Sequence, residues 1–188
     1  MIIAKAGEEK FEKFPLPDEG TVQAVCAGVW DLGVQEVEYN GKKKHQHKIV
    51  IAWELDQLID APDSDYHNMP YMLSKTYTLS LYENANLRKD LESWRGKPFD
   101  EQTVQQGFDV EKLYSLNCFV GVIHVTKNGR TFANISSILP PMKDTKMLEP
   151  TRGKDDDPPK WVQEKQEMAV ADDIDSMNEE LEETDGPF

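Results

Sequence analysis

A basic run over residues 41–48 is the part of this chain whose side chains best suit a binding site. It holds four lysines within seven positions. On an extended strand these lysines would form a line of positive charge that follows a phosphate backbone, and nearby aromatic rings would stack on bases of any sequence. The alternative is an exposed hairpin whose lysines keep a sheet edge soluble. The candidate nucleic-acid-binding residues are Tyr39, just before this run, and Lys42, Lys43, Lys44, Gln46 and Lys48 within it.

Residues 74–79 form a second candidate stretch, in which polar and apolar side chains alternate. Because successive side chains of a strand point to opposite faces, Thr76 and Thr78 are predicted to point outward, toward a ligand. Lys75 and Tyr77 share the parity of the apolar residues. A place at the rim of the binding surface and a place in the interior both stay open for this pair.

A third candidate follows a predicted hairpin turn at Asn128-Gly129, a dipeptide that favours two-residue turns. Arg130 and Phe132 come directly after this turn. A charge beside an aromatic ring suits a phosphate and a base. The alternative is an ordinary charged residue in a turn.

A metal site is one interpretation of His45 and His47, which share one face of a predicted strand. No further cluster of Cys, His or carboxylate residues with convincing ligand spacing accompanies them in the sequence. The sequence also has no Gly-x-Ser-x-Gly motif and no glycine-rich phosphate loop. We therefore expect a protein that is not an enzyme and that has no metal and no cofactor.

A strongly acidic segment covers residues 155–188. It holds 13 Asp or Glu residues and two lysines, so it carries −11 of the formal net charge of −14. The first 154 residues are close to neutral, with 22 acidic and 19 basic residues. An acidic, weakly hydrophobic segment that ends in an aromatic residue suits a tethered ligand, so Asp185, Pro187 and Phe188 are candidate partner-binding residues. We also expect this segment to compete weakly with DNA for the lysines.

Hydrophobic periodicity and turn residues predict a mainly β protein. The predicted elements are a strand that begins at Gly20, strands over 43–55 and 71–81, a helix over 84–94, a short helix over 109–114, and strands over 117–127 and 130–139. Five strands with the main helix between the third and the fourth (β-β-β-α-β-β) is the order of a five-stranded OB-fold barrel. Other small barrels share part of this order.

Asn40-Gly41 predicts a two-residue turn between the first two strands, and this turn fixes the register of their pairing. Residues whose numbers sum to 81 should then face each other. The predicted core face holds Cys26, Trp30, Leu32, Val34, His47, Ile49, Ile51 and Trp53. The predicted outer face holds Val37, Tyr39, Lys42, Lys44, Gln46 and Lys48.

The chain of 188 residues is predicted to hold one folded domain. Residues 1–19 form a lead-in segment, residues 20–141 the OB-fold nucleic-acid-binding domain, and residues 142–188 a flexible acidic tail. No apolar run is long enough for a membrane span, and the N-terminus lacks the features of a signal peptide. Cys26 and Cys118 are expected to be buried free thiols in a reducing cytoplasm, although a disulfide between them stays open.

The sequence resembles the family of bacteriophage OB-fold single-stranded DNA-binding proteins. The resemblance covers roughly residues 14–140, is carried by residues 53–55, 74–81 and 86–96, and is most specific over 74–96. It implies a protein that coats single-stranded DNA with little sequence preference during DNA replication or recombination, in the cytoplasm of an infected bacterium.

The acidic segment is similar in kind to the tails of bacterial single-stranded DNA-binding proteins, which end in Pro-Phe. Pro187 and Phe188 match that ending, whereas Gly186 stands where the bacterial pattern has a larger aliphatic residue. The similarity implies that replication or recombination proteins, encoded by host or phage, bind the tail.

Two other functions are compatible with the sequence. One is a non-enzymatic replisome module that binds another protein and not DNA. The other is an acidic DNA mimic, which is disfavoured because most of the charge lies in one segment and is not spread over the domain. The sequence leaves open the oligomeric state, the number of nucleotides bound and the preference between DNA and RNA.

Overall fold

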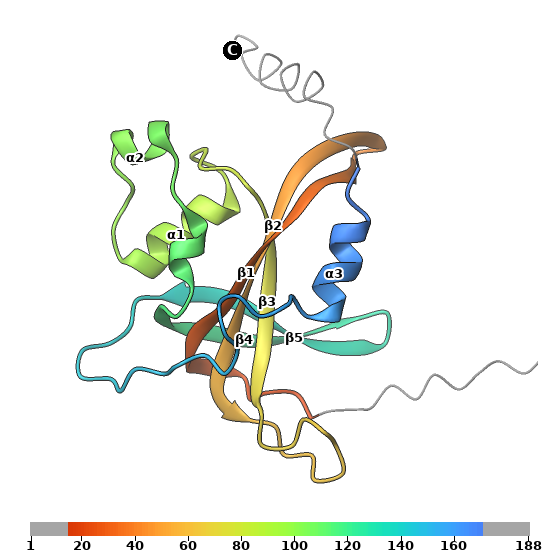
Figure 1. Cartoon of the computed structure of the whole chain (residues 1–188), viewed down its shortest axis with the longest axis vertical. Coiled ribbons are helices and arrows are strands. Elements are labelled where there is room, and N and C mark those ends of the chain that lie inside the picture. Colours follow the sequence, from red (N-terminus) through yellow and green to blue (C-terminus); the bar gives the residue numbers. More distant parts are fainter. Residues whose placement is uncertain (1–14, 171–188) are drawn as a thin grey trace, which may run out of the picture.

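One five-stranded antiparallel sheet dominates the computed structural model, which describes residues 15–170 (Figure 1). The strands are β1 (Gly20–Tyr39), β2 (Lys42–Leu58), β3 (Pro70–Thr78), β4 (Asn117–Lys127) and β5 (Arg130–Leu139). The helices are α1 (Asn86–Arg95), α2 (Glu101–Gln106), the 3-10 helix η1 (Val110–Leu113) and α3 (Lys160–Glu167). The mainly β class and the position of α1 between the third and fourth strands are confirmed, whereas α2 and α3 are additions. None of these helices is both long and apolar enough to cross a membrane.

The strand order across the sheet is β3-β2-β1-β4-β5, so β3 and β5 are its edges. The two edge strands approach each other, but no backbone pairing joins them in residues 15–170. Side chains of β3 and β5, among them Tyr71 and Phe132, line a cavity between these edges. The described sheet is therefore open, in contrast to the closed barrel that the sequence predicts.

Both predicted hairpin turns are confirmed. Asn40 and Gly41 have φ of 52° and 75°, and Asn128 and Gly129 have the same two values. Positive φ at both central residues defines the type I′ turn, whose twist matches that of the flanking strands. Asn and Gly adopt this conformation at the lowest cost, so the local sequence sets the ends of both hairpins.

The predicted register holds next to the first turn. Every pair from Tyr39 with Lys42 to Gly33 with Lys48 has numbers that sum to 81. Farther from the turn, the register shifts by one residue between Asp31 and Gly33, and by one more between Cys26 and Gly28. These β-bulges each place one extra residue in β1, which changes the face to which the following side chains point.

The bulges correct part of the predicted core face. Trp30 pairs with Val50, and Leu32 packs in a small cluster with the same valine. Ile49 and Ile51 point to the other side of β2, into the main core. The prediction that Trp30 and Leu32 share a face with these isoleucines is therefore wrong, because the turn alone cannot reveal a bulge eight residues away.

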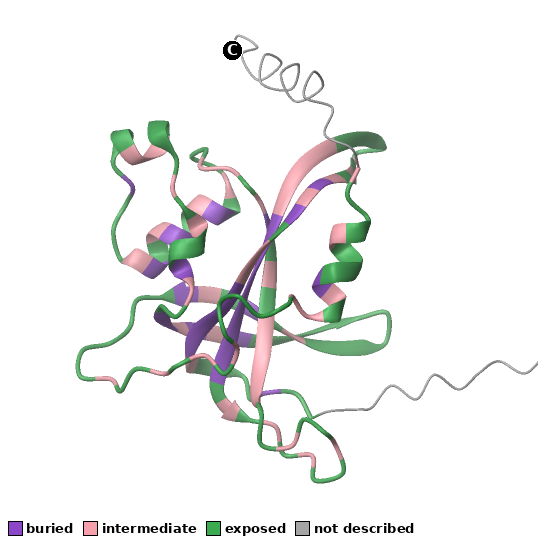
Figure 2. Ribbon diagram, in the orientation of Figure 1, coloured by how far each residue is buried: buried purple, intermediate pink, exposed green. Residues whose placement is uncertain are grey.

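The main core lies between α1 and the inner face of the sheet, defined here as the face that carries Ile49 and Ile51 (Figure 2). Helix α1 buries Leu87, Leu91 and Trp94, whose spacing of four and three residues places them on one face of a helix. The helix ends at Gly96, which has the left-handed backbone conformation that glycine adopts most readily. The buried core residues on the strands include Ala24, Cys26, Trp53, Leu55, Tyr77, Cys118, Val120, Val122, Ile135 and Ile138.

Residues 150–170, here called the strap, fold back over the outer face of the sheet, which is opposite α1 (Figure 1). Val162 of α3 is fully buried in this position, and the Val170 amide donates a hydrogen bond to the Val34 carbonyl at 2.9 Å. The sequence predicts a flexible tail from residue 142, but the folded part extends to residue 170. The acidic composition of residues 155–188 gives no indication of α3, the short helix that follows Pro158-Pro159. Residues 171–188 lie outside the described part of the chain.

Two buried thiols make the stability of the fold sensitive to alkaline pH. Cys26 and Cys118 are free cysteines, as predicted. Burial raises the pKa of Cys26 to about 12 and also raises the pKa of Cys118 and of the Tyr77 hydroxyl. In the unfolded chain these groups lose protons near their ordinary pKa values, about 8.5 for Cys and about 10 for Tyr. Above that range the unfolded state binds fewer protons than the folded state, so the free energy of unfolding falls as pH rises.

We therefore expect urea unfolding to give constant stability from about pH 7 to about pH 8 and a progressive loss toward about pH 11. A Cys26→Ala variant should show a shallower loss, because alanine has no proton to release. Stability that does not change between pH 8 and pH 11 would contradict the burial of these groups.

Candidate nucleic-acid interface

The predicted lysine and threonine rows lie side by side on the outer face of β2 and β3. Lys48 is directly opposite Thr78, and Val50 is opposite Thr76. Opposite residues of an antiparallel pair share one face, so the side chains of both threonines lie on the same face of the sheet as Lys48. Thr76 is exposed and Thr78 is half-buried. The structure thus joins two stretches that are about 30 residues apart in the sequence.

Lys48 is held in place by two neutral side chains. Its Nζ donates to Gln46 Oε1 at 2.7 Å and to Thr78 Oγ1 at 2.8 Å. Within residues 15–170 it forms no ion pair, and partial burial lowers its pKa. A cation that is partly desolvated and lacks a counter-charge gains stability from an anion. A phosphate oxygen would supply that anion.

Lys42 and Lys44 continue the row toward the tip of the β1–β2 hairpin, where both are exposed. Neither forms an ion pair with another described residue. Lys43 points to the opposite face, and its Nζ lies 2.9 Å from Glu36 Oε1. This hydrogen bond raises the pKa of Lys43 and lowers the pKa of Glu36. Lys43 is therefore separated from the row, as its parity requires.

The backbone of Tyr39 pairs with Lys42 at the end of the hairpin. Its side chain lies outside the described part of the structure. Its predicted stacking role stays a prediction.

Lys75 and Tyr77 point inward, toward α1. Lys75 Nζ lies 2.5 Å from Asp90 Oδ2, and the Tyr77 hydroxyl donates to the same oxygen at 2.7 Å. Tyr77 is only 3% exposed. Of the two places that the sequence leaves open, the structure selects the interior for this pair, so the two residues lie on the face opposite Thr76 and Thr78.

Arg130 and Phe132 lie on the β4–β5 hairpin, whose tip lies apart from that of the β1–β2 hairpin (Figure 1). Arg130 is exposed, and Phe132 is 49% exposed. Phe132 lines the cavity of about 800 Å³ between the edge strands. These two residues are therefore not part of the lysine row, and Phe132 belongs to a separate aromatic cleft.

The aromatic cleft contains side chains that the sequence analysis does not identify. Tyr66 comes from the β2–β3 loop, Tyr71 from β3, and Arg152 and Trp161 from the strap. Burial, followed by the charges of two nearby aspartates, raises the pKa of Tyr71. The sequence gives no signal for this cleft, because its rings come from a polar loop and from a segment with the composition of a tail.

The two histidines of the β2 strand each face a carboxylate. His47 Nε2 lies 2.7 Å from Asp31 Oδ1, and His45 Nε2 lies 3.8 Å from Glu36 Oε2. Within residues 15–170 no group of three or more His, Cys, Asp or Glu residues is arranged to hold a metal ion.

No protein-family model matches the chain, and no curated protein matches it significantly. The candidate interface therefore depends on its own geometry. Four of the predicted residues, Lys48, Gln46, Thr76 and Thr78, lie together, and Lys42 and Lys44 extend them along β2.

Proposed function

We propose that this protein binds single-stranded DNA on the outer face of β2 and β3, with little sequence preference, during phage DNA replication or recombination. The observation that carries the proposal is the row of three cations, Lys42, Lys44 and Lys48, which have no counter-charge among the described residues. The row runs beside the hydroxyl groups of Thr76 and Thr78.

The arrangement of the sheet supports an OB-type fold. The order β3-β2-β1-β4-β5, with α1 between β3 and β4, is compatible with an OB-fold in which the edge strands β3 and β5 do not pair. In such folds the outer faces of the second and third strands bind oligonucleotides. The lysine row lies on this face.

Recognition would depend on charge and shape. The lysines would neutralise phosphates, and the threonine hydroxyls would donate hydrogen bonds to phosphate or sugar oxygens. The half-exposed ring of Phe132 on β5 would stack on bases that leave the lysine row. Every base has a π-face, so this mechanism tolerates any sequence.

The proposal predicts that affinity for a poly-pyrimidine single strand falls steeply with salt. With three lysines on phosphates, the slope of log K against log salt should be about −2 or steeper. Fluorescence anisotropy of a labelled oligothymidine between about 50 mM and about 500 mM salt measures it. A duplex of the same length is the control. A flat salt response or equal affinity for the duplex would contradict the proposal.

We also propose that Asp185, Pro187 and Phe188 bind replication or recombination proteins. Residues 171–188 contain eight acidic and no basic residues. Such a segment would compete with DNA for the lysine row by charge, so its effect should disappear at high salt.

A further inference from the structure

Trp30 lies across Gly28 on the outer face of the sheet. A Cβ placed on Gly28 would lie 2.1 Å from Trp30 Cζ2, so only glycine leaves room for the indole. The residue opposite Gly28 on β2 is Ala52, which is also small. Because Gly28 and Ala52 are both small, the indole ring of Trp30 fits against the sheet above them. Val50 is the cross-strand partner of Trp30, and Lys48 is the next residue of β2 that points to the same face. The sequence predicts Trp30 on the core face, whereas the bulge at Leu32 turns it outward.

The strap covers this ring. Trp161 contacts Trp30 edge to face, with ring centroids 6.2 Å apart and an angle of 87° between the planes. Three consecutive aspartates of the strap, residues 155–157, line a cavity of about 250 Å³ together with Gly28 and Trp30. The strap therefore brings carboxylates and an aromatic ring to the same part of the sheet. Single-stranded DNA has the same two features, because its phosphates are negatively charged and its bases are aromatic.

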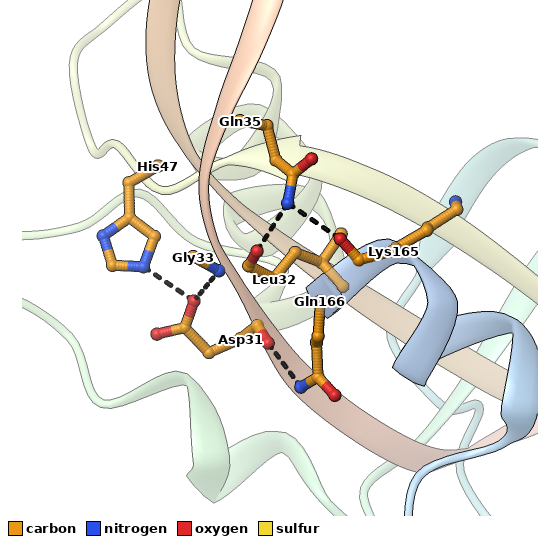
Figure 3. Close-up of polar contacts among 7 residues, drawn as sticks. All are labelled: Asp31, Leu32, Gly33, Gln35, His47, Lys165 and Gln166. Atoms are coloured by element: carbon orange, nitrogen blue, oxygen red, sulfur yellow. Dashed lines mark hydrogen bonds and ion pairs between the residues drawn. The ribbon is translucent and has the colours of Figure 1, made fainter. Parts of the chain in front are cut away.

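Within the described residues, two side-chain hydrogen bonds join α3 to β1 (Figure 3). Gln166 Nε2 donates to the Asp31 carbonyl at 2.7 Å, and Gln35 Nε2 donates to the Lys165 carbonyl at 2.9 Å. Nearer its start, the strap is held by Thr151, whose amide and hydroxyl both donate to the Glu54 carboxylate.

The apolar contacts of α3 are also few. The buried cluster under the helix consists of Leu32, Val50 and Val162, with the two tryptophans at its margin. A short helix with so little buried surface opens more easily than the main core.

We propose that Trp30 is a base-stacking position for single-stranded DNA and that the strap occupies this position until DNA displaces it. The proposal rests on the proposed function, and it adds a site residue and a closing element. Residues 150–170 contain four basic and five acidic residues, so their net charge is only −1. Packing holds the strap, and its competition with DNA should persist at salt concentrations that suppress the effect of residues 171–188.

The first test uses the two partners of one ring contact. Trp30→Ala and Trp161→Ala both remove the Trp–Trp contact, so a purely structural role would move DNA affinity in the same direction for both. We expect opposite directions: Trp161→Ala binds oligothymidine several-fold more tightly, and Trp30→Ala binds it about 5- to 150-fold more weakly, the range for loss of one stacked base. Circular dichroism checks that both variants are folded.

The second test locks the strap in place. A Cβ on Gly33 would lie 3.0 Å from Ala169 Cβ, which is about 0.5 Å shorter than the 3.5–4.5 Å of a disulfide, so the strap has to move outward by this small distance to form one. In the variant Gly33→Cys/Ala169→Cys we expect the oxidised protein to bind oligothymidine at least tenfold more weakly than the same protein after reduction. Because Gly33 has a φ of 67°, cysteine strains the backbone there, but equally in both redox states. Cys26 and Cys118 are buried and will not exchange with the new pair.

The outcomes separate this proposal from the proposed function. Equal affinity of the oxidised and reduced forms, or a change in the same direction for the two alanine variants, would overturn the strap proposal and leave DNA binding intact. If neither the wild-type protein nor Trp161→Ala binds single strands, the proposed function fails and the strap proposal fails with it. Binding by Trp161→Ala alone would support both.

Discussion

Replacing Lys42, Lys44 and Lys48 with glutamate should lower affinity for single-stranded DNA by on the order of 100-fold at low salt. The three side chains form the cationic row on the outer face of β2, and Lys48 is already partly desolvated. Each substitution removes one phosphate contact and adds one repulsive charge. The slope of log K against log salt should become less steep by about 2, because about 0.7 counterion is released per phosphate of a single strand.

A matched control changes the net charge equally on other surfaces. Lys89, Lys97 and Lys112 are exposed and lie on or near α1 and η1. The triple variant with glutamate at these positions should keep most of its affinity for single-stranded DNA, and its slope of log K against log salt should be unchanged. If both triple variants lose affinity equally, the loss reflects total charge and the lysine row is not the binding site.

Replacing Asp90 with alanine should lower the free energy of unfolding by about 2–4 kcal/mol. One oxygen of Asp90 accepts from the buried Tyr77 hydroxyl and from Lys75 Nζ. Without Asp90, both donors lose their partner in a place with little access to water, and the cost of desolvation is no longer offset. Urea unfolding monitored by circular dichroism measures the change.

Asp90→Asn is the conservative control, because its amide oxygen still accepts one hydrogen bond and a smaller loss should follow. A loss below about 0.5 kcal/mol for Asp90→Ala would show that water replaces the carboxylate at no cost. DNA affinity gives an independent check. Lys75→Ala should leave it unchanged, whereas a binding role for Lys75 would lower it.

The parts of this protein that were predicted from sequence depend on neighbours along the chain. Asn40-Gly41 and Asn128-Gly129 form the expected turns, because positive φ is a property of the residues themselves. Leu87, Leu91 and Trp94 lie on the buried face of α1, because the helical period is fixed. The parity of Thr76 and Thr78 follows from the strand period in the same way, and the turn alone places Lys42 to Lys48 correctly.

The parts that sequence missed depend on contacts between distant residues. Thr151 donates a hydrogen bond to Glu54, which lies 97 positions earlier in the sequence, and no local pattern marks residues 150–170 as folded. The direction of Trp30 depends on a bulge that sequence spacing does not reveal. Lys75 has the inward parity that the sequence shows, but its partner, Asp90 Oδ2 at 2.5 Å, lies on the next element and is visible only in the folded structure.

The hairpins, the main helix and the row of lysines therefore follow from local residue properties, since each depends on backbone preference or on a fixed period. Contacts between distant elements select which of those residues share a surface and what covers it. Burial of Val162 and the placement of Trp161 on Trp30 depend on packing between the two ends of the described chain. Such packing is a property of the folded molecule as a whole, because the free energy of each contact depends on every element that holds the two partners together.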